Sequence, residues 1–344
     1  MDHLEQKSHQ APSGVKYNYY TSAAQDSKPT ILLCHGCPDS SDLWANLTRD
    51  YLVPNGFGVL VPDLVGYGLS DKPDDINPYA LDSICKDIIS ILDAETLPKV
   101  ITLGHDFGAF VSSKLITYHP DRISGLITLG TAHAPPSPEA FDFEKIRQMQ
   151  EQYLGYCSGW YFPLFTSDKG YELMDAHVDR MFTALHGGGE RMKQVCCYPN
   201  AFEDWLKDGS DGTEAVLPYA ESDEFRKQWI GRLERDGFRA PMLWYKGVVK
   251  SLTLQRDQQA LEAGNHVVKV PYLFIAALKD PLAPAVAIEG LKAQGLLPDV
   301  TVREVQASHW LMLEKPQETG EAIVSWLKER YLKFDWKHHD ALNL

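Results

Sequence analysis

The chain has 344 residues, of which 44% are hydrophobic, and its formal net charge at pH 7 is −14. This length can bury a large core and predicts one large domain with an insertion, or two domains. The acidic balance argues against nucleic acid and against an anionic membrane surface as partners, because both attract clustered Lys and Arg.

The polar first segment and the six cysteines predict a cytoplasmic protein. Residues 1–14 lack the apolar centre of a secretory signal, and no apolar run is long enough to span a bilayer. The cysteines form no pattern typical of a disulfide scaffold. Cys34 and Cys37 make a CxxC pair, but a redox role is the less favoured interpretation because Cys34 ends a predicted buried strand. A reducing cytosol fits best.

Short apolar runs at residues 30–34, 57–63, 100–104 and 125–130 predict buried parallel strands. Amphipathic stretches lie between these runs, as in a sheet built from βαβ units. A stretch rich in Trp, Tyr and Met interrupts this alternation and predicts a helical insertion over residues 137–256. The predicted core is therefore residues 1–136 together with residues 257–344.

Two motifs follow predicted strands in the first part of the core. The motif His-Gly-Cys-Pro at residues 35–38 forms a turn that can aim the amide N–H of Cys37 at a nucleophile. Residues 104–108 read Gly-His-Asp-Phe-Gly, and the serine version of this pentapeptide is the nucleophile elbow of α/β-hydrolases. Asp106 would then be the nucleophile, and the N–H of Phe107 would be the second oxyanion donor.

The strand pattern resumes after the insertion, at residues 272–278 and 300–307, and an amphipathic helix at residues 319–333 follows. Asp280 comes just after the first of these strands, and His309 just after the second. The order nucleophile, acid, histidine is that of an α/β-hydrolase triad, and the carboxyl ends of strands are where open α/β sheets place their active sites.

With these motifs the sequence resembles the α/β-hydrolase-fold epoxide hydrolases of the soluble type, which use an aspartate nucleophile. HGxP at 35–38, GHDxGA at 104–109, Asp280 and His309 carry the resemblance, which covers most of the chain. It implies an α/β fold, with a mostly parallel sheet flanked by helices and a helical cap inserted, and neither a cofactor nor a metal.

The resemblance also implies two cap tyrosines that donate hydrogen bonds to the epoxide oxygen. Tyr245, in the segment 241–247, matches the second of them, although Leu243 and Lys246 stand where the family has Asn and Arg. The family's pattern counted back from Phe165 favours Tyr161 as the first.

The aromatic segment 153–168 leaves other candidates open. Tyr153 and Tyr156 remain alternatives to Tyr161 as the first cap donor. Tyr156, Trp160 and Trp244 are expected to bind substrate. An aromatic-rich insertion favours a small apolar or aromatic epoxide as the substrate. A homodimer is a further expectation.

The predicted reaction converts the epoxide to a vicinal diol. Asp106, already ionised at neutral pH, attacks an epoxide carbon and forms an alkyl ester, while Tyr161 and Tyr245 assist the leaving oxygen. His309, oriented by Asp280, then activates the water that hydrolyses the ester.

Three other functions remain open at this point. A haloalkane or haloacid dehalogenase uses the same Asp and His but needs N–H donors for the halide, which Trp160 or Trp244 could supply. A lactone or ester hydrolase would have to pass through an anhydride on Asp106, which is a less favourable intermediate. A ligand-binding receptor could keep the fold and lose turnover, but its usual mark is a broken triad.

Overall fold

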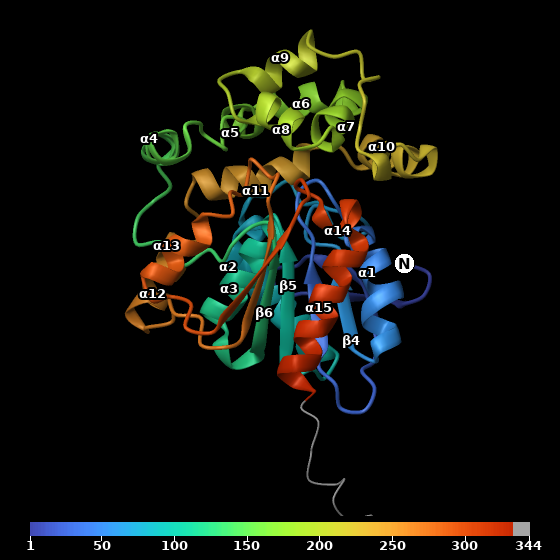
Figure 1. Cartoon of the computed structure of the whole chain (residues 1–344), viewed down its shortest axis with the longest axis vertical. Coiled ribbons are helices and arrows are strands. Elements are labelled where there is room, and N and C mark those ends of the chain that lie inside the picture. Colours follow the sequence, from blue (N-terminus) through green and yellow to red (C-terminus); the bar gives the residue numbers. More distant parts are fainter. Residues whose placement is uncertain (333–344) are drawn as a thin grey trace, which may run out of the picture.

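The computed structural model describes residues 1–332 (Figure 1). Lys333, where the predicted last helix ends, and the predicted core residues after it lie outside this range. The sheet has eight strands in the order β1-β2-β4-β3-β5-β6-β7-β8. These are β1 (Glu5–Gln10), β2 (Lys16–Ser22), β3 (Thr30–Cys34), β4 (Gly58–Pro62), β5 (Val100–His105), β6 (Ile123–Leu129), β7 (Tyr272–Ala277) and β8 (Val300–Val305).

The central strands are parallel and buried, as their apolar sequences predict. Strands β4, β3, β5, β6, β7 and β8 pair in parallel, and each corresponds to one of the six predicted runs. Every residue of β3, β4, β5 and β7 is buried, which fits continuous apolar runs covered on both faces. Strands β1 and β2 were not predicted, and they extend one edge of the sheet by antiparallel pairing.

Helices of the core cover both faces of the sheet. Helix α2 shows why: its buried residues include Leu81, Ile84, Ile88 and Ile91, which lie on one helical face. Helix α3 packs against α2 and α12, whereas α15 packs against α1, β7 and β8. The core helices are α1 (Ala45–Leu47), α2 (Leu81–Ala94), α3 (Phe107–Tyr118), α12 (Leu254–Glu262), α13 (Ala287–Ala293), α14 (Leu311–Glu314) and α15 (Pro316–Tyr331). Of the helices between residues 1 and 332, none is both long and apolar enough to cross a membrane.

The insertion between β6 and β7 is helical and lies over one end of the sheet, with α11 nearest the strands (Figure 1). The side chain of Asp142 caps α4 by accepting the N–H of Lys145 at 3.0 Å. The cap helices are α4 (Phe143–Leu154), α5 (Phe162–Thr166), α6 (Gly170–Asp175), α7 (Val178–His186), α8 (Gly189–Cys196), α9 (Ala201–Lys207), α10 (Asp223–Asp236) and α11 (Arg239–Val249).

Candidate active site

Asp106 occupies a strained turn between β5 and α3, with φ +52° and ψ −123°. A non-glycine residue in this region is strained, and such strain is typical of a functional position. The turn needs glycine on both sides. A Cβ on Gly104 would meet the carbonyl oxygen of Gly108 at 2.1 Å, and one on Gly108 would meet that of Cys34 at 1.9 Å. The side chain of Asp106 keeps 18% of its surface exposed.

Two backbone N–H groups stabilise the Asp106 carboxylate. The N–H of Cys37 donates to Oδ1 at 2.9 Å, and the N–H of Phe107 at the start of α3 also lowers the pKa of this carboxyl. Burial raises the pKa of Asp106, whereas His309 and these two N–H groups oppose that rise. The predicted oxyanion donors therefore face the predicted nucleophile.

His309 lies between two carboxylates. Its Nδ1 is 2.7 Å from Oδ2 of Asp280, and its Nε2 is 3.8 Å from Oδ2 of Asp106. Asp280 is held in place because its Oδ1 accepts the N–H of Leu282 at 2.9 Å. Burial lowers the pKa of His309, but the charges of Asp280, Asp106 and Asp39 outweigh burial and raise it to about 9.

Asp39, which the sequence analysis did not single out, lies buried in the same loop as Cys37. Its Oδ2 accepts the indole N–H of Trp310 at 2.8 Å. Burial raises its pKa to about 6, against the opposing effect of the Trp310 hydrogen bond. The sequence feature that could have pointed to Asp39 is its position directly after the His-Gly-Cys-Pro motif.

Tyr161 and Tyr245 come from the cap and line the same cavity as Asp106 and His309. Their ring centroids are 5.8 Å apart, and the ring of Tyr245 meets that of Phe107 edge-on at 4.8 Å. Burial, together with nearby acidic groups that include Asp106, raises the pKa of both phenols well above the ordinary value. Both hydroxyls are therefore protonated donors at neutral pH.

The cavity has a volume of about 30 Å³. Apart from the polar groups already described, its walls are mainly apolar. They include Phe165, Met181, Leu185, Met192, Phe202, Phe238 and Met242. An apolar lining with a few polar groups suits an apolar ligand.

None of the three predicted substrate-binding residues, Tyr156, Trp160 and Trp244, is among the residues that line this cavity. The hydroxyl of Tyr156 donates to the carbonyl of Pro281 at 3.1 Å, and the indole N–H of Trp244 donates to the carbonyl of Val65 at 2.9 Å. Trp160 lines a separate cavity beside α5, α6 and α9. Tyr153, an alternative for the first cap donor, is 77% exposed.

Residues 29–316 match the model of the family described as alpha/beta hydrolase fold. The chain belongs to the α/β hydrolase fold family. The fold predicted from the sequence is confirmed, and so is the resemblance to epoxide hydrolases, because proteins of that name are among the relatives of this α/β hydrolase.

Two curated relatives and two solved structures illustrate the likeness. Epoxide hydrolase A of Mycobacterium tuberculosis is 26% identical, over 89% of this chain and 92% of its own. Bifunctional epoxide hydrolase 2 of Rattus norvegicus is 24% identical over 92% of this chain, which spans only 56% of the rat protein.

The crystal structure of epoxide hydrolase A from Mycobacterium thermoresistibile superposes with a TM-score of 0.75 at 24% identity, over 94% of this chain and 98% of its own. An epoxide hydrolase from Vigna radiata gives 0.72 at 20% identity, over 96% of this chain and 99% of its own. At these identities, the two structures bear on the fold alone.

Proposed function

We propose that this α/β hydrolase opens small apolar or aromatic epoxides to vicinal diols through an ester on Asp106. In the first step, a carboxylate oxygen of Asp106 attacks an epoxide carbon and the carbon–oxygen bond of the ring breaks. The oxygen that leaves takes a proton from Tyr161 or Tyr245, and the tyrosine regains its proton from water.

In the second step, His309 takes a proton from water, and the resulting hydroxide attacks the ester carbonyl of Asp106. The N–H groups of Cys37 and Phe107 stabilise the oxyanion that forms. When the intermediate collapses, the diol oxygen leaves with the proton that His309 held. Asp106 is left as a carboxylic acid and returns to the carboxylate by releasing its proton to solvent, which balances the proton that the tyrosine took from water. Asp280 keeps the imidazole oriented throughout.

The observation that carries this proposal is an aspartate at the elbow that faces two protonated tyrosines across an apolar cavity. An aspartate needs no base to attack an alkyl carbon, and the tyrosines stabilise an alkoxide. The names of the relatives support the same activity.

Dehalogenation has less support, because it needs N–H donors beside the nucleophile for the halide. Trp310 lines the cavity that holds Asp106, but its indole N–H already donates to Asp39 and is not free to bind a halide. The N–H of Trp244 bonds to the carbonyl of Val65. A lactone or ester hydrolase has no structural observation in its favour. The cap limits at 137–256, the homodimer and the cytoplasmic location stay predictions.

The test is a single turnover of styrene oxide with excess enzyme in heavy-oxygen water. We expect an unlabelled diol and a labelled peptide that contains Asp106, because solvent oxygen enters the carboxylate when the ester is hydrolysed. The Asp106→Asn variant, in which this attack is lost, is the control. Label in the diol during that first turnover would refute the covalent route and make Asp106 a general base.

A further inference from the structure

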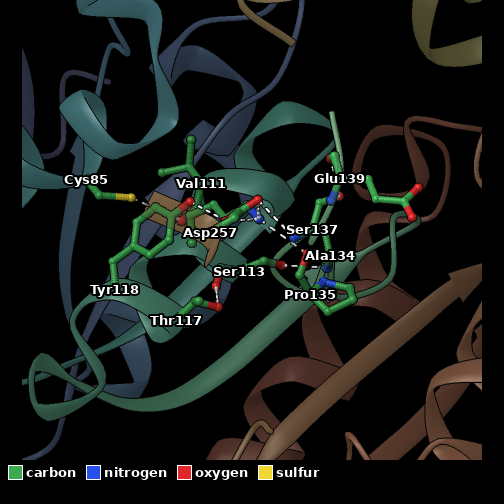
Figure 2. Close-up of polar contacts among 11 residues, drawn as sticks. Cys85, Val111, Ser113, Thr117, Tyr118, Ala134, Pro135, Ser137, Glu139 and Asp257 are labelled. Atoms are coloured by element: carbon green, nitrogen blue, oxygen red, sulfur yellow. Dashed lines mark hydrogen bonds and ion pairs between the residues drawn. The ribbon is translucent and has the colours of Figure 1, made fainter. Parts of the chain in front are cut away.

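A buried ion pair joins Lys114 of helix α3 to Asp257 of helix α12, and neither residue lines the catalytic cavity. Figure 2 shows Asp257 and its surroundings. The Nζ of Lys114 is 2.8 and 2.9 Å from the two carboxylate oxygens of Asp257. The side chains are only 6% and 5% exposed. Burying such a pair costs free energy, because both charges lose much of their hydration.

The carboxylate of Asp257 binds two further donors (Figure 2). The hydroxyl of Tyr118 lies 2.5 Å from Oδ1, and the backbone N–H of Ser137 lies 3.0 Å from Oδ2. Lys114 also donates to the carbonyl of Pro135 at 3.3 Å. The network therefore connects α3, the chain that enters the cap and the helix that follows the cap.

Further hydrogen bonds around the network join the same segments. On the entering chain, the N–H of Ala134 donates to Oγ of Ser113 at 3.0 Å, and that of Phe141 donates to Oγ of Ser251 at 2.8 Å. Gln258 on α12 donates to the carbonyl of Pro138 at 3.2 Å. Both connections of the cap are thus tied to each other and to α3.

Stability alone does not account for this arrangement. Apolar residues of similar volume often replace a buried ion pair at no cost in folding free energy, whereas removal of one partner is strongly destabilising. A buried network of directed hydrogen bonds instead favours one arrangement of the segments that it joins.

The elements held by this network carry the groups that must meet in the first chemical step. Helix α3 begins at Phe107, directly after the nucleophile Asp106, and ends at Tyr118. Helix α11, which carries Tyr245, ends at Val249, and α12 with Asp257 begins at Leu254. The short stretch between these helices includes Ser251, which binds the entering chain.

We propose that Asp257, with Lys114 and Tyr118, is a positioning group that sets the cap tyrosines against Asp106. The inference rests on the proposed epoxide hydrolysis. It assigns the network to the first step, which needs Tyr161 and Tyr245. The second step depends on His309, Asp280 and the oxyanion donors, which all belong to the core.

The main test is the double variant Lys114→Met with Asp257→Leu, which removes both charges. Met is close to Lys in volume, and Leu keeps the branched shape of Asp. The control, Lys292→Gln with Glu289→Gln, removes an exposed ion pair 3.0 Å long on α13. Single-turnover kinetics with styrene oxide give the rates of ester formation and ester hydrolysis separately. We expect ester formation to slow by about tenfold or more, as misplaced reacting groups do, while the hydrolysis rate stays near that of the control.

Equal slowing of both steps would overturn the inference, and so would wild-type rates for both. If the double variant does not fold, Tyr118→Phe carries the same test, because it removes one hydrogen bond and leaves the ion pair. The same pattern of rates then supports the positioning role, and unchanged rates overturn it.

Failure of the proposed function would be visible separately, as absence of any reaction of the wild type with styrene oxide. Hydrogen exchange at residues 134–141 and 250–257 would then decide the role of the network. Faster exchange in the double variant than in the control supports the network as the anchor of the cap, and equal exchange overturns it.

Discussion

The charge of Asp106 should control the protonation of His309. Burial lowers the pKa of His309, yet three carboxylates, among them Asp106, raise it to about 9. The substitution Asp106→Asn removes one of these charges and keeps the shape of the side chain. It is also electrically equivalent to the neutral ester proposed as the intermediate.

The size of the effect follows from the distance of 3.8 Å between Nε2 of His309 and Oδ2 of Asp106. Two unit charges at this separation attract by about 4 kcal/mol at an effective dielectric constant of about 20, and by about 2 kcal/mol at about 40. Since 1.36 kcal/mol corresponds to about one pH unit, the titration midpoint of His309 should fall by about 1.5 to 3 pH units in Asp106→Asn.

The assay is an NMR titration of the histidine Cε1–H signals, in which His309→Gln identifies the signal of His309. Asp42→Asn is the control, because this carboxylate lies three residues after Asp39, in the 3-10 helix Ser41–Trp44, and is 71% exposed. A midpoint within about 0.3 pH units of the wild-type value, well below the shift expected from the distance, would refute the electrostatic reasoning.

The consequence for the reaction is a base that becomes available at the right moment. In the free enzyme, a pKa of about 9 keeps His309 protonated at neutral pH. Formation of the ester neutralises Asp106, so the pKa of His309 falls and the imidazole can accept a proton from water. Ester hydrolysis should therefore proceed at a pH at which His309 of the resting enzyme is still protonated.

Two further predictions concern the separate steps. Tyr245→Phe and Tyr161→Phe should each lower epoxide turnover by about 100-fold while circular dichroism stays unchanged, because the hydroxyl is the proton donor and the ring provides packing; wild-type rates in both would remove the tyrosines from the mechanism. His309→Gln should still form the ester but release diol very slowly, so intact-protein mass spectrometry should find the adduct on Asp106. An unmodified variant after incubation with a confirmed substrate would mean that His309 acts in the first step.

The sequence was a good guide to the parallel strands of the sheet and a poor guide to the edge formed by β1 and β2. Buried parallel strands such as β3 and β5 are continuous apolar runs, which a sequence displays directly. Strand β1, Glu5–Gln10, has no buried residue, and it was missed because its pairing with β2 leaves no apolar pattern in the chain. Such a strand is defined by its backbone hydrogen bonds to a neighbouring strand, and the local sequence does not reveal these bonds.

In the site, too, the core residues could be predicted from the sequence and the cap residues only in part. Asp106, Asp280 and His309 follow strands in a fixed order, so strand positions predict that they meet. Cap residues have no such frame, because the direction of an aromatic side chain depends on the packing of its helix. Tyr161 and Trp160 are adjacent in sequence, yet they line different cavities.

The cap is inserted in the chain between two strands that pair with each other, and this has a consequence for synthesis of the chain. Strand β6 ends at Leu129, and its partner β7 begins only at Tyr272. At about 5 to 20 residues per second, a ribosome needs roughly 7 to 30 seconds to make the intervening chain, during which the β7-facing edge of β6 has no partner strand. An unpaired apolar edge favours aggregation, so a chaperone that holds the nascent chain should bind in this interval. The acid and base reach the site after β7 and β8, so a chain stalled before them carries the nucleophile without its partners.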